Sequence, residues 1–475
     1  MTPHEHGARL KGLAIRVVAP PAQAPWQQDA VTRLRRQGAA VQVVAPTDEP
    51  SRSGDVRDVV LVLDPESAPP QGRSWCFDFE TDPRRGLVTA FLLEVDGSEA
   101  MVLRSARMRW TPASATTSTE ALLREAAMLP VRAALDLVRT ARPTEAGQKR
   151  SRPTGVRPVS AVPRKAAAGA HTLRRQLDRV MRANHWSIGA ARLSDLSGTA
   201  PANGYVWAEL PEDGGFLADP FLVPGSQPLT VLAEQLTAHD LTGRIVRLEL
   251  GEDGWSPPEP VLPLPVHASY PYLFTGEIDG QTSICLVPET SALRQVRLYR
   301  GAADGRSWRL HRVLLHDVAL ADPTVFHHAG RWWLFGTDAD SGVNTHLCAY
   351  WAEDLDGPWR PHAANPVKVD IASARPAGTP WVDGAGLVRP GQDSTERYGA
   401  QVVLHRITRL DPNEFEEVPY GVVGPDPRGA YPDGLHTVCR EADRVVIDGC
   451  RRAPAVRRVV PALRRQLTRA PEEVR

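Results

Sequence analysis

A repeat in the second half of the chain constrains the fold more than any other feature. Five short segments share a small residue, a variable residue and a proline: ADPFLV (218–223), SYPYLF (269–274), ADPTVF (321–326), ARPAGT (374–379) and AYPDGL (430–435). Their prolines lie 51, 52, 53 and 56 residues apart. A period of ~50 residues built from short strands is typical of a four-stranded β-propeller blade. The repeat therefore predicts an all-β five-bladed propeller over residues 184–450.

The variable residue of each repeat is the first candidate for function. In a propeller the first strand of each blade lines the central channel, so equivalent positions converge on one axis. Proline suits the start of such a strand, where no ladder donor is needed. We therefore expect a ring made of the five residues that precede the prolines: Asp219, Tyr270, Asp322, Arg375 and Tyr431.

Further polar candidates lie near these segments: His267, Glu289, Asp393 and His436, with Glu234, Asp338 and Asp433 as additional members. Two carboxyl groups across a sugar can act as acid and base around an oxocarbenium-like transition state. Burial beside another carboxylate would raise one pKa so that this group can donate a proton. Arg375 would hold another carboxylate ionised.

Each of these residues also has a structural interpretation. An Asp before a proline often caps a turn, and Arg375 could form a buried salt bridge with Asp219 or Asp322. The set as a whole favours a functional site at the opening of the central channel, called the mouth below. A purely structural repeat would tend to use the same residue in every blade.

The first 141 residues have a different character. Residues 13–46 show a strand, helix, strand pattern, and residues 58–65 form a third β-branched run. This order predicts the start of a parallel sheet and hence an α/β domain over residues 1–141. A helical pattern over residues 119–141 contains Pro130, which we expect to kink or break it.

Two basic segments flank the predicted propeller. Residues 142–183 are rich in Pro, Ala, Gly and basic residues, which predicts a linker that leads into a helix at 171–184. Residues 451–475 contain a run of arginines and are expected to form a surface helix or a tail.

Composition narrows the class of protein. Lys+Arg and Asp+Glu both number 56, so the balance disfavours a whole-chain nucleic-acid binder. Five widely spaced cysteines without a C-x-x-C pair fit a reducing cytoplasm, and no apolar run approaches the ~20 residues of a membrane span. His327, His328 and His346 fit no ligand spacing, so neither a metal nor another cofactor is expected.

An ordered set of motifs carries a family resemblance over about 184–450: ADPF, HASYPYLF, VPET, ADPT, WWLF, GPWRPH-x-x-NPV, ARPAG, RPGQD-x-x-x-x-YG and GLHT. The set resembles the five-bladed propeller domain related to glycoside hydrolase family 43. More narrowly, it resembles the N-terminal domain of glucosamine inositolphosphorylceramide transferase and its bacterial relatives. The resemblance implies a general base, a general acid and a pKa-modulating acid in the mouth.

By this resemblance Asp219 would be the base, Glu289 the general acid and Asp322 the modulator. Tyr270 stands where a second-blade Asp is expected, so hydrolysis is an implied activity only. In the plant protein transfer is assigned to another domain, so the resemblance does not imply glycosyl transfer.

The N-terminal region, about 12–140, resembles a formyltransferase fold more faintly, chiefly in WCFDFETDPRRG (75–86). Formyl transfer in that fold relies on an Asn-His-Asp constellation. No His lies between His6 and His171, and that segment also contains no Asn. We therefore expect a degenerate domain that docks or positions a partner.

The leading hypothesis is a cytoplasmic carbohydrate-active protein that binds a sugar or glycoconjugate and processes a glycosidic bond. Its substrate-binding residues would be His267, Tyr270, Arg375, Asp393, Tyr431 and His436. One alternative is a non-catalytic module that binds a sugar or another polar ligand. Another is a biosynthetic tailoring enzyme that uses the same mouth for other chemistry, since function belongs to the site rather than to the fold.

Overall fold

The computed structural model describes residues 10, 13–20, 23–45, 58–63, 74–82, 86–96, 99–109, 123, 126–140, 149–151, 182–192, 196–197, 200–201, 204–210, 215–237 and 242–454. The chain divides into two compact units. The first is Met1–Thr172 with Lys368–Ile371, and the second is Leu173–Val367 with Ala372–Arg475.

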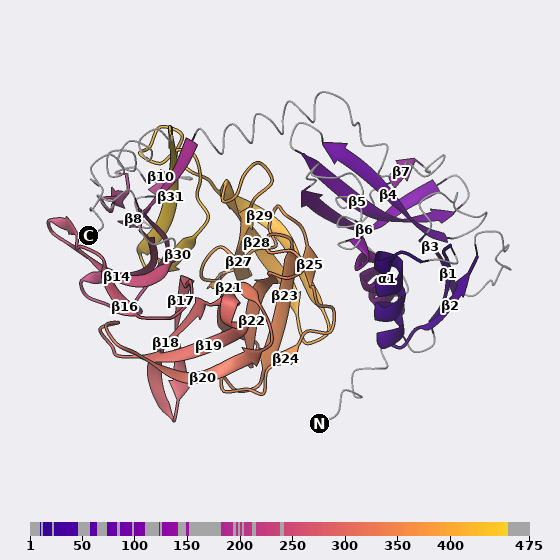
Figure 1. Ribbon diagram of the computed structural model, residues 1–475, viewed down its shortest axis with the longest axis horizontal. Coiled ribbons are helices and arrows are strands. Elements are labelled where there is room, and N and C mark those ends of the chain that lie inside the picture. The colour runs from indigo at the N-terminus through magenta and orange to yellow at the C-terminus, as the bar shows by residue number, and fades with distance from the viewer. Residues whose placement is uncertain are drawn as a thin grey trace, which may run out of the picture. The chain divides into compact units, whose positions relative to one another are not determined.

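The first unit contains a seven-stranded sheet in the order β2-β1-β3-β4-β5-β6-β7 (Figure 1). Its strands are β1 (Ala14–Val18), β2 (Ala40–Val44), β3 (Asp58–Val62), β4 (Ser74–Asp82), β5 (Leu87–Asp96), β6 (Glu99–Arg109) and β7 (Lys149–Ser151). The pairs among β2, β1, β3 and β4 are parallel, as expected for the first three of these strands. From β4 to β7 the pairs are antiparallel, so the sheet is mixed rather than parallel throughout.

Two helices pack on this sheet. α1 (Pro25–Arg36) connects β1 to β2 as predicted, and its Trp26, Ala30 and Leu34 are buried in the core. α3 (Leu129–Thr140) begins one residue before Pro130. A proline in the first turn breaks no helical hydrogen bond, so Pro130 lies at the start of this helix. The turn at Ala127 and Met128 interrupts the helical pattern just before it, which is the break, rather than the kink, of the two predicted outcomes.

The described residues of the expected linker form strands. β7 lies inside the 142–183 segment and pairs with β6, and β8 (Arg182–Arg192) already begins at its end. The helix expected over 171–184 falls mainly outside the described residues, as does the expected helix or tail beyond Pro454. The last propeller strand, β31 (Arg444–Pro454), extends four residues past the predicted boundary.

The second unit is a five-bladed propeller, as the repeat predicts (Figure 1). The first blade holds β12 (Phe216–Leu222), β13 (Leu229–Leu236), β14 (Arg244–Gly251), β15 (Gly254–Trp255) and β16 (Glu259–Leu262). The second holds β17 (Ser269–Ile278), β18 (Gln281–Glu289), β19 (Gln295–Gly301) and β20 (Trp308–His316). The third holds β21 (Leu320–His328), β22 (Arg331–Asp338), β23 (His346–Ala352) and β24 (Arg360–Pro361), and the fourth holds β26 (Trp381–Asp383), β27 (Gly386–Asp393), β28 (Gln401–Leu410) and β29 (Phe415–Val423).

The fifth blade closes the ring with strands from both ends of the propeller. It contains β30 (Val438–Glu441) and β31, followed by β8 and β11 (Val206–Trp207). β31 pairs antiparallel with β8 along its whole length, from Arg444↔Arg192 to Pro454↔Arg182. This pairing places the N-terminal strand β8 and the C-terminal strand β31 of the propeller in one blade, which closes the ring. Three short elements complete the assignment: β9 (Leu196–Ser197), β10 (Ala200–Pro201) and β25 (Lys368–Val369).

The repeated x-Pro dipeptides form bulges in the inner strands. β12, β17 and β21 each shift register at this point, and the residue before the proline has a left-handed backbone, with φ of 51° at Asp219, 43° at Tyr270 and 51° at Asp322. The proline therefore lies within the strand, at a bulge that needs no ladder hydrogen bond, rather than at the strand start.

The fourth and fifth repeats differ from the first three. They form only isolated bridges, Pro376↔Gly391 and Pro432↔Cys450, instead of a regular inner strand. A left-handed backbone costs a non-glycine residue of the order of 1 kcal/mol, and such strain is concentrated at sites where a side chain must be aimed.

Candidate functional site

Two sets of polar residues line the inner side of the blades. The first is the x-Pro set. The second lies on the following strand of each blade, where Glu234 pairs with Ala218 and Glu289 pairs with Ser269. Gln392 takes the same place in the fourth blade, since its N–H donates to the Arg375 carbonyl at 2.8 Å. Asp448 takes the corresponding position in the closing blade, where its backbone N–H donates to the Thr437 carbonyl.

Asp322 and Arg375 form a buried ion pair between the third and fourth blades. The Arg375 guanidinium donates through Nε to Oδ2 of Asp322 at 2.6 Å and through Nη2 to Oδ1 at 3.1 Å. Gln392 Nε2 donates to the same Oδ2 at 2.8 Å. The sequence left the partner of Arg375 open between Asp219 and Asp322, and the structure pairs it with Asp322.

Glu289 lies beside this pair. Its Oε2 accepts the backbone N–H of Asp322 at 3.1 Å and lies 3.7 Å from Arg375 Nη2. Its Oε1 accepts the Ser291 hydroxyl at 3.2 Å. Burial, the largest cause, and the neighbouring Asp322 raise the pKa of Glu289 to about 8, so this carboxyl group is protonated at neutral pH.

Asp219 belongs to a second cluster on the closing blade. Its Oδ1 accepts the Thr437 hydroxyl at 2.7 Å and lies 3.8 Å from His436 Nε2. The other ring nitrogen of His436 contacts Asp448 Oδ2, and the imidazole stacks on Trp186 at 4.2 Å between centroids. Burial raises the pKa of Asp219 to about 6 even though His436 opposes this shift, so Asp219 is mainly ionised at pH 7.

The pKa values of His436 and Glu234 are both raised, but for different reasons. Burial disfavours the charged imidazole of His436, but Asp448 and Asp219 outweigh it and raise its pKa. Glu234 pairs with His267 at 3.4 Å, and burial together with Asp219 and Glu289 raises the pKa of Glu234 well above its ordinary value. The channel thus holds several carboxyl groups whose pKa values burial and mutual repulsion shift upward.

The remaining predicted residues lie in other surroundings. Tyr270 is fully buried, and its hydroxyl accepts the Gly378 N–H at 2.9 Å. Asp393 accepts hydrogen bonds from Thr395 and Gln401 and so holds the turn that follows β27. Tyr431 packs on Trp207 in the closing blade, 4.4 Å between centroids.

Sequence reasoning missed Asp448 and Gln392. Each lies 16 residues after the proline of its repeat, on the second strand of the blade like Glu234 and Glu289. Alignment of the repeats by their second strands would have found them. The Asp448 carboxylate accepts the backbone N–H groups of His436 and Thr437 at 2.8 and 3.0 Å and that of Asp219 at 3.2 Å.

Among the described residues, one group of His and carboxylate side chains brings its ligand atoms within 4.8 Å of one another: Asp219, His436 and Asp448. His and carboxylate are suitable ligands for several divalent metals. The oxygens of these two carboxylates already accept the Thr437 hydroxyl and three backbone N–H groups. The group is therefore complete as a hydrogen-bonded cluster.

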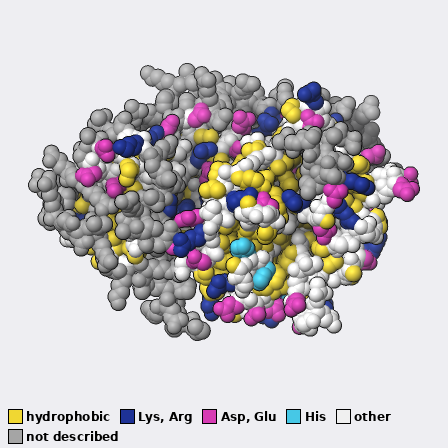
Figure 2. All heavy atoms as spheres, turned by 180° about the vertical axis from the view of Figure 1, so that it is seen from behind, with side chains coloured by type: hydrophobic (Ala, Val, Ile, Leu, Met, Phe, Trp, Pro, Cys, Tyr) yellow, Lys and Arg dark blue, Asp and Glu magenta, His cyan; other side chains and the backbone are white. Residues whose placement is uncertain are grey.

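Two observations on the described residues concern possible nucleic-acid and membrane partners. On the face shown in Figure 2, basic side chains are mixed with acidic ones rather than gathered in one patch. None of the helices in the described part of the chain is long and apolar enough to cross a membrane.

The fold and the mouth define a five-bladed propeller whose channel is lined by buried acids. Residues 206–428 match the family model described as Glucosamine inositolphosphorylceramide transferase 1, N-terminal. This match confirms, for the propeller, the resemblance that the ordered motifs indicate.

Curated relatives agree with this match. Glucosamine inositolphosphorylceramide transferase 1 of Oryza sativa subsp. japonica is 31% identical over 261 residues, which cover 49% of this chain and 34% of the relative. The protein of that name from Arabidopsis thaliana is 32% identical over 210 residues, which cover 43% of this chain and 27% of the relative. The chain thus spans about a third or less of these relatives' length.

A solved structure described as a thermostable family-43 glycoside hydrolase also aligns with part of this chain. The alignment covers 45% of this chain and 96% of that one, at 13% identity and a TM-score of 0.28. An alignment this loose adds nothing to the fold described above.

The raised pKa of Glu289 predicts a particular pH dependence of stability. A carboxyl group whose pKa is higher in the folded than in the unfolded state stabilises the fold at low pH, and this contribution is lost as pH rises from about 4.5 to about 8. Glu289→Gln should therefore lose less stability than the wild type between pH 5 and pH 8, by up to about 1.4 kcal/mol per pH unit. Urea unfolding at several pH values measures this, with the exposed Glu277→Gln on β17 as the control that keeps the wild-type slope.

Proposed function

We propose that the propeller mouth binds a sugar or glycoconjugate and processes a glycosidic bond by carboxyl acid/base chemistry. One arrangement carries the proposal: Glu289 and Asp219 are both buried in one channel, beside different neighbours. Burial and Asp322 raise the pKa of Glu289 to about 8, and burial, opposed by His436, raises that of Asp219 to about 6, which favours a protonated Glu289 and an ionised Asp219 at neutral pH. Such a pair supplies one acid and one base.

In this mechanism the Glu289 carboxyl proton moves to the glycosidic oxygen as the bond to the leaving group breaks. Asp219 takes a proton from the incoming hydroxyl, which belongs either to water or to an acceptor alcohol, as the new bond to the sugar carbon forms. The matched relatives are named as transferases, so an acceptor alcohol is included. After the step Glu289 is ionised and Asp219 is protonated, and exchange with solvent restores both.

Asp322 and Arg375 act as a positioning pair in this scheme. The guanidinium holds the Asp322 carboxylate with two hydrogen bonds, and the Asp322 backbone N–H in turn fixes Glu289. The Asp322 negative charge keeps the Glu289 proton in place. The left-handed backbone at Asp219 and Asp322 supports this assignment, since strained positions are concentrated at functional sites.

The pH dependence of kcat/KM tests these roles. Activity requires ionised Asp219 and protonated Glu289, so the rate should rise as pH passes about 6 and fall as pH passes about 8. The measurement is a pH–rate profile on aryl glycosides and amino-sugar conjugates. A rate that stays flat from pH 5 to pH 9 would remove both residues from the chemistry.

A second candidate function is recognition without turnover. It is favoured by the hydrogen bonding of Asp322. The Asp322 carboxylate accepts three hydrogen bonds from Arg375 and Gln392, as expected for a group with a structural role. On this alternative the mouth binds a polar ligand and returns it unchanged. Isothermal titration would then show binding, and the wild-type protein would leave the bound ligand intact after long incubation.

A further inference from the structure

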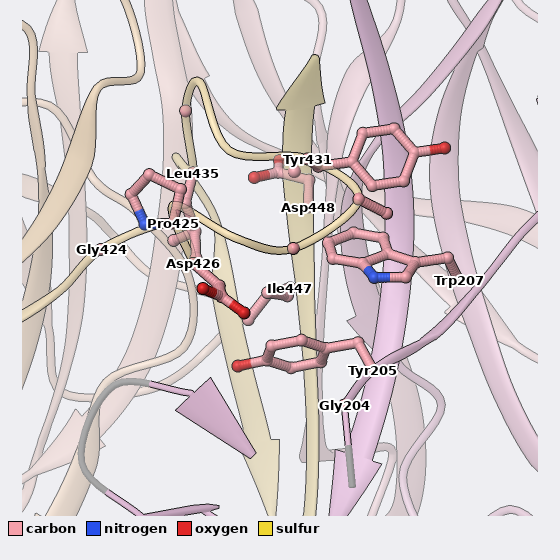
Figure 3. A pocket seen from close by; sticks show the side chains of 14 residues that line it. Gly204, Tyr205, Trp207, Gly424, Pro425, Asp426, Tyr431, Leu435, Ile447 and Asp448 are labelled. Atoms are coloured by element: carbon pink, nitrogen blue, oxygen red, sulfur yellow. The ribbon is translucent and has the colours of Figure 1, made fainter. Parts of the chain in front are cut away.

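The closing blade contains a pocket of about 230 Å³ that the proposed chemistry does not use. Its walls come from three stretches: the residues around β11, the loop that follows β29, and β31 (Figure 3). Three aromatic side chains, Tyr205, Trp207 and Tyr431, lie along one side of the pocket, and Asp426 approaches from the loop opposite.

The Trp207 ring lies flat on the sheet of the closing blade. A Cβ atom at Gly189 on β8 would come within 2.8 Å of this ring, and one at Gly449 on β31 within 2.5 Å. Glycine at both positions therefore makes room for the indole. Tyr431 packs against the Trp207 ring at 4.4 Å and Tyr205 lies at 5.4 Å between centroids, so the three rings form one packed group along this side of the pocket.

The charged side chains that line the pocket are acidic. Asp426 accepts the backbone N–H of Arg428 through Oδ1 at 2.9 Å and is only half-buried. Burial and the charge of Asp426 raise the pKa of Tyr205 to about 12. Asp448 also borders the pocket, but its carboxylate is fully buried and bonded inward. The described residues that line the pocket include no Lys or Arg.

A cation already lies near the rim of this aromatic group. The Arg451 guanidinium is 5.7 Å from the centroid of the Tyr431 ring. Aromatic faces attract cations through the ring quadrupole, and a nearby carboxylate adds a direct charge. A neutral ligand would gain from stacking and could donate a hydrogen bond to Asp426, but it would carry no charge to pair with this carboxylate.

We propose that this pocket binds a small organic ammonium ion, held against the packed aromatic group of Tyr205, Trp207 and Tyr431, with Asp426 as its counter-ion. Aromatic rings on one side and a carboxylate on the other form an open cage for a cation. The proposed ligand contacts involve neither Glu289 nor Asp219, so this proposal can be tested separately from the proposed function.

Isothermal titration of the full chain with choline chloride tests the proposal, with 3,3-dimethylbutan-1-ol as the uncharged ligand of the same shape. Choline should bind at least about tenfold more tightly than the alcohol. Asp426→Asn should weaken choline binding about fivefold, while the exposed Asp253→Asn and the channel variant Glu289→Gln should leave it unchanged.

A second variant separates stacking from charge. Tyr205→Leu removes one wall of the cage at a half-buried position and should also weaken choline binding, with the melting temperature measured alongside. No binding of choline, or equal affinity for choline and the alcohol, would overturn the proposal. A response to Asp253→Asn as large as that to Asp426→Asn would do the same.

Discussion

Replacement of Arg375 by Met is expected to destabilise the propeller by about 3–5 kcal/mol, because it leaves Asp322 buried without its counter-charge. Asp322 is 2% exposed, and Arg375 supplies two of its hydrogen bonds. Denaturant unfolding at pH 7 measures the change. Arg406→Met is the matched control, since Arg406 makes a similar two-bond pair with Asp383 nearer the surface and should cost far less.

A double variant separates lost charge pairing from lost packing. In Arg375→Met with Asp322→Leu neither charge remains, so most of the lost stability should return. Ligand binding in the mouth should not return with it. An Arg375→Met protein within about 1 kcal/mol of the wild type would show that the pair lies in a far wetter site than its contacts indicate.

Glu289→Gln is expected to lower the rate of glycosidic bond cleavage by roughly 10²–10⁴-fold, since the amide cannot donate the proton that the leaving oxygen needs. Binding should persist, because the amide oxygen can still accept the Asp322 N–H. The loss should be smaller for an aryl glycoside with an acidic phenol, which leaves without protonation. Glu277→Gln on the same blade is exposed and should act like the wild type.

That dependence on the leaving group is the decisive feature of the Glu289 prediction. A residue that only shapes the mouth would slow all substrates alike. If Glu289→Gln lost equal factors on acidic and basic leaving groups, Glu289 would not be the acid, and Glu234, whose pKa burial also raises, would be the next candidate.

The sequence predicts the blades well because the repeat is local. Each x-Pro segment lies in one short stretch, and its period can be read without knowledge of any long-range contact. The sequence also shows that Asp219, Asp322 and Arg375 occupy equivalent positions. It does not show that Arg375 pairs with Asp322, because this pairing depends on how neighbouring blades are rotated about the axis.

Asp448 illustrates what a linear reading misses. It reaches Asp219 only because the last strands close onto β8, a pairing between segments more than 250 residues apart. The antiparallel strand β5 was missed for another reason. Its apolar residues form a nearly continuous run instead of alternating, because both faces of the strand are largely buried.

The most direct test of the central claim is a product analysis by mass spectrometry. Wild type, Asp219→Asn and Glu289→Gln would be incubated with glycosides and amino-sugar conjugates in H₂¹⁸O, with and without an acceptor alcohol. The account predicts cleaved product from the wild type, carrying ¹⁸O or the acceptor, and little from either variant. Ligand that binds all three proteins and is recovered unchanged from the wild type would contradict it and identify the mouth as a recognition site.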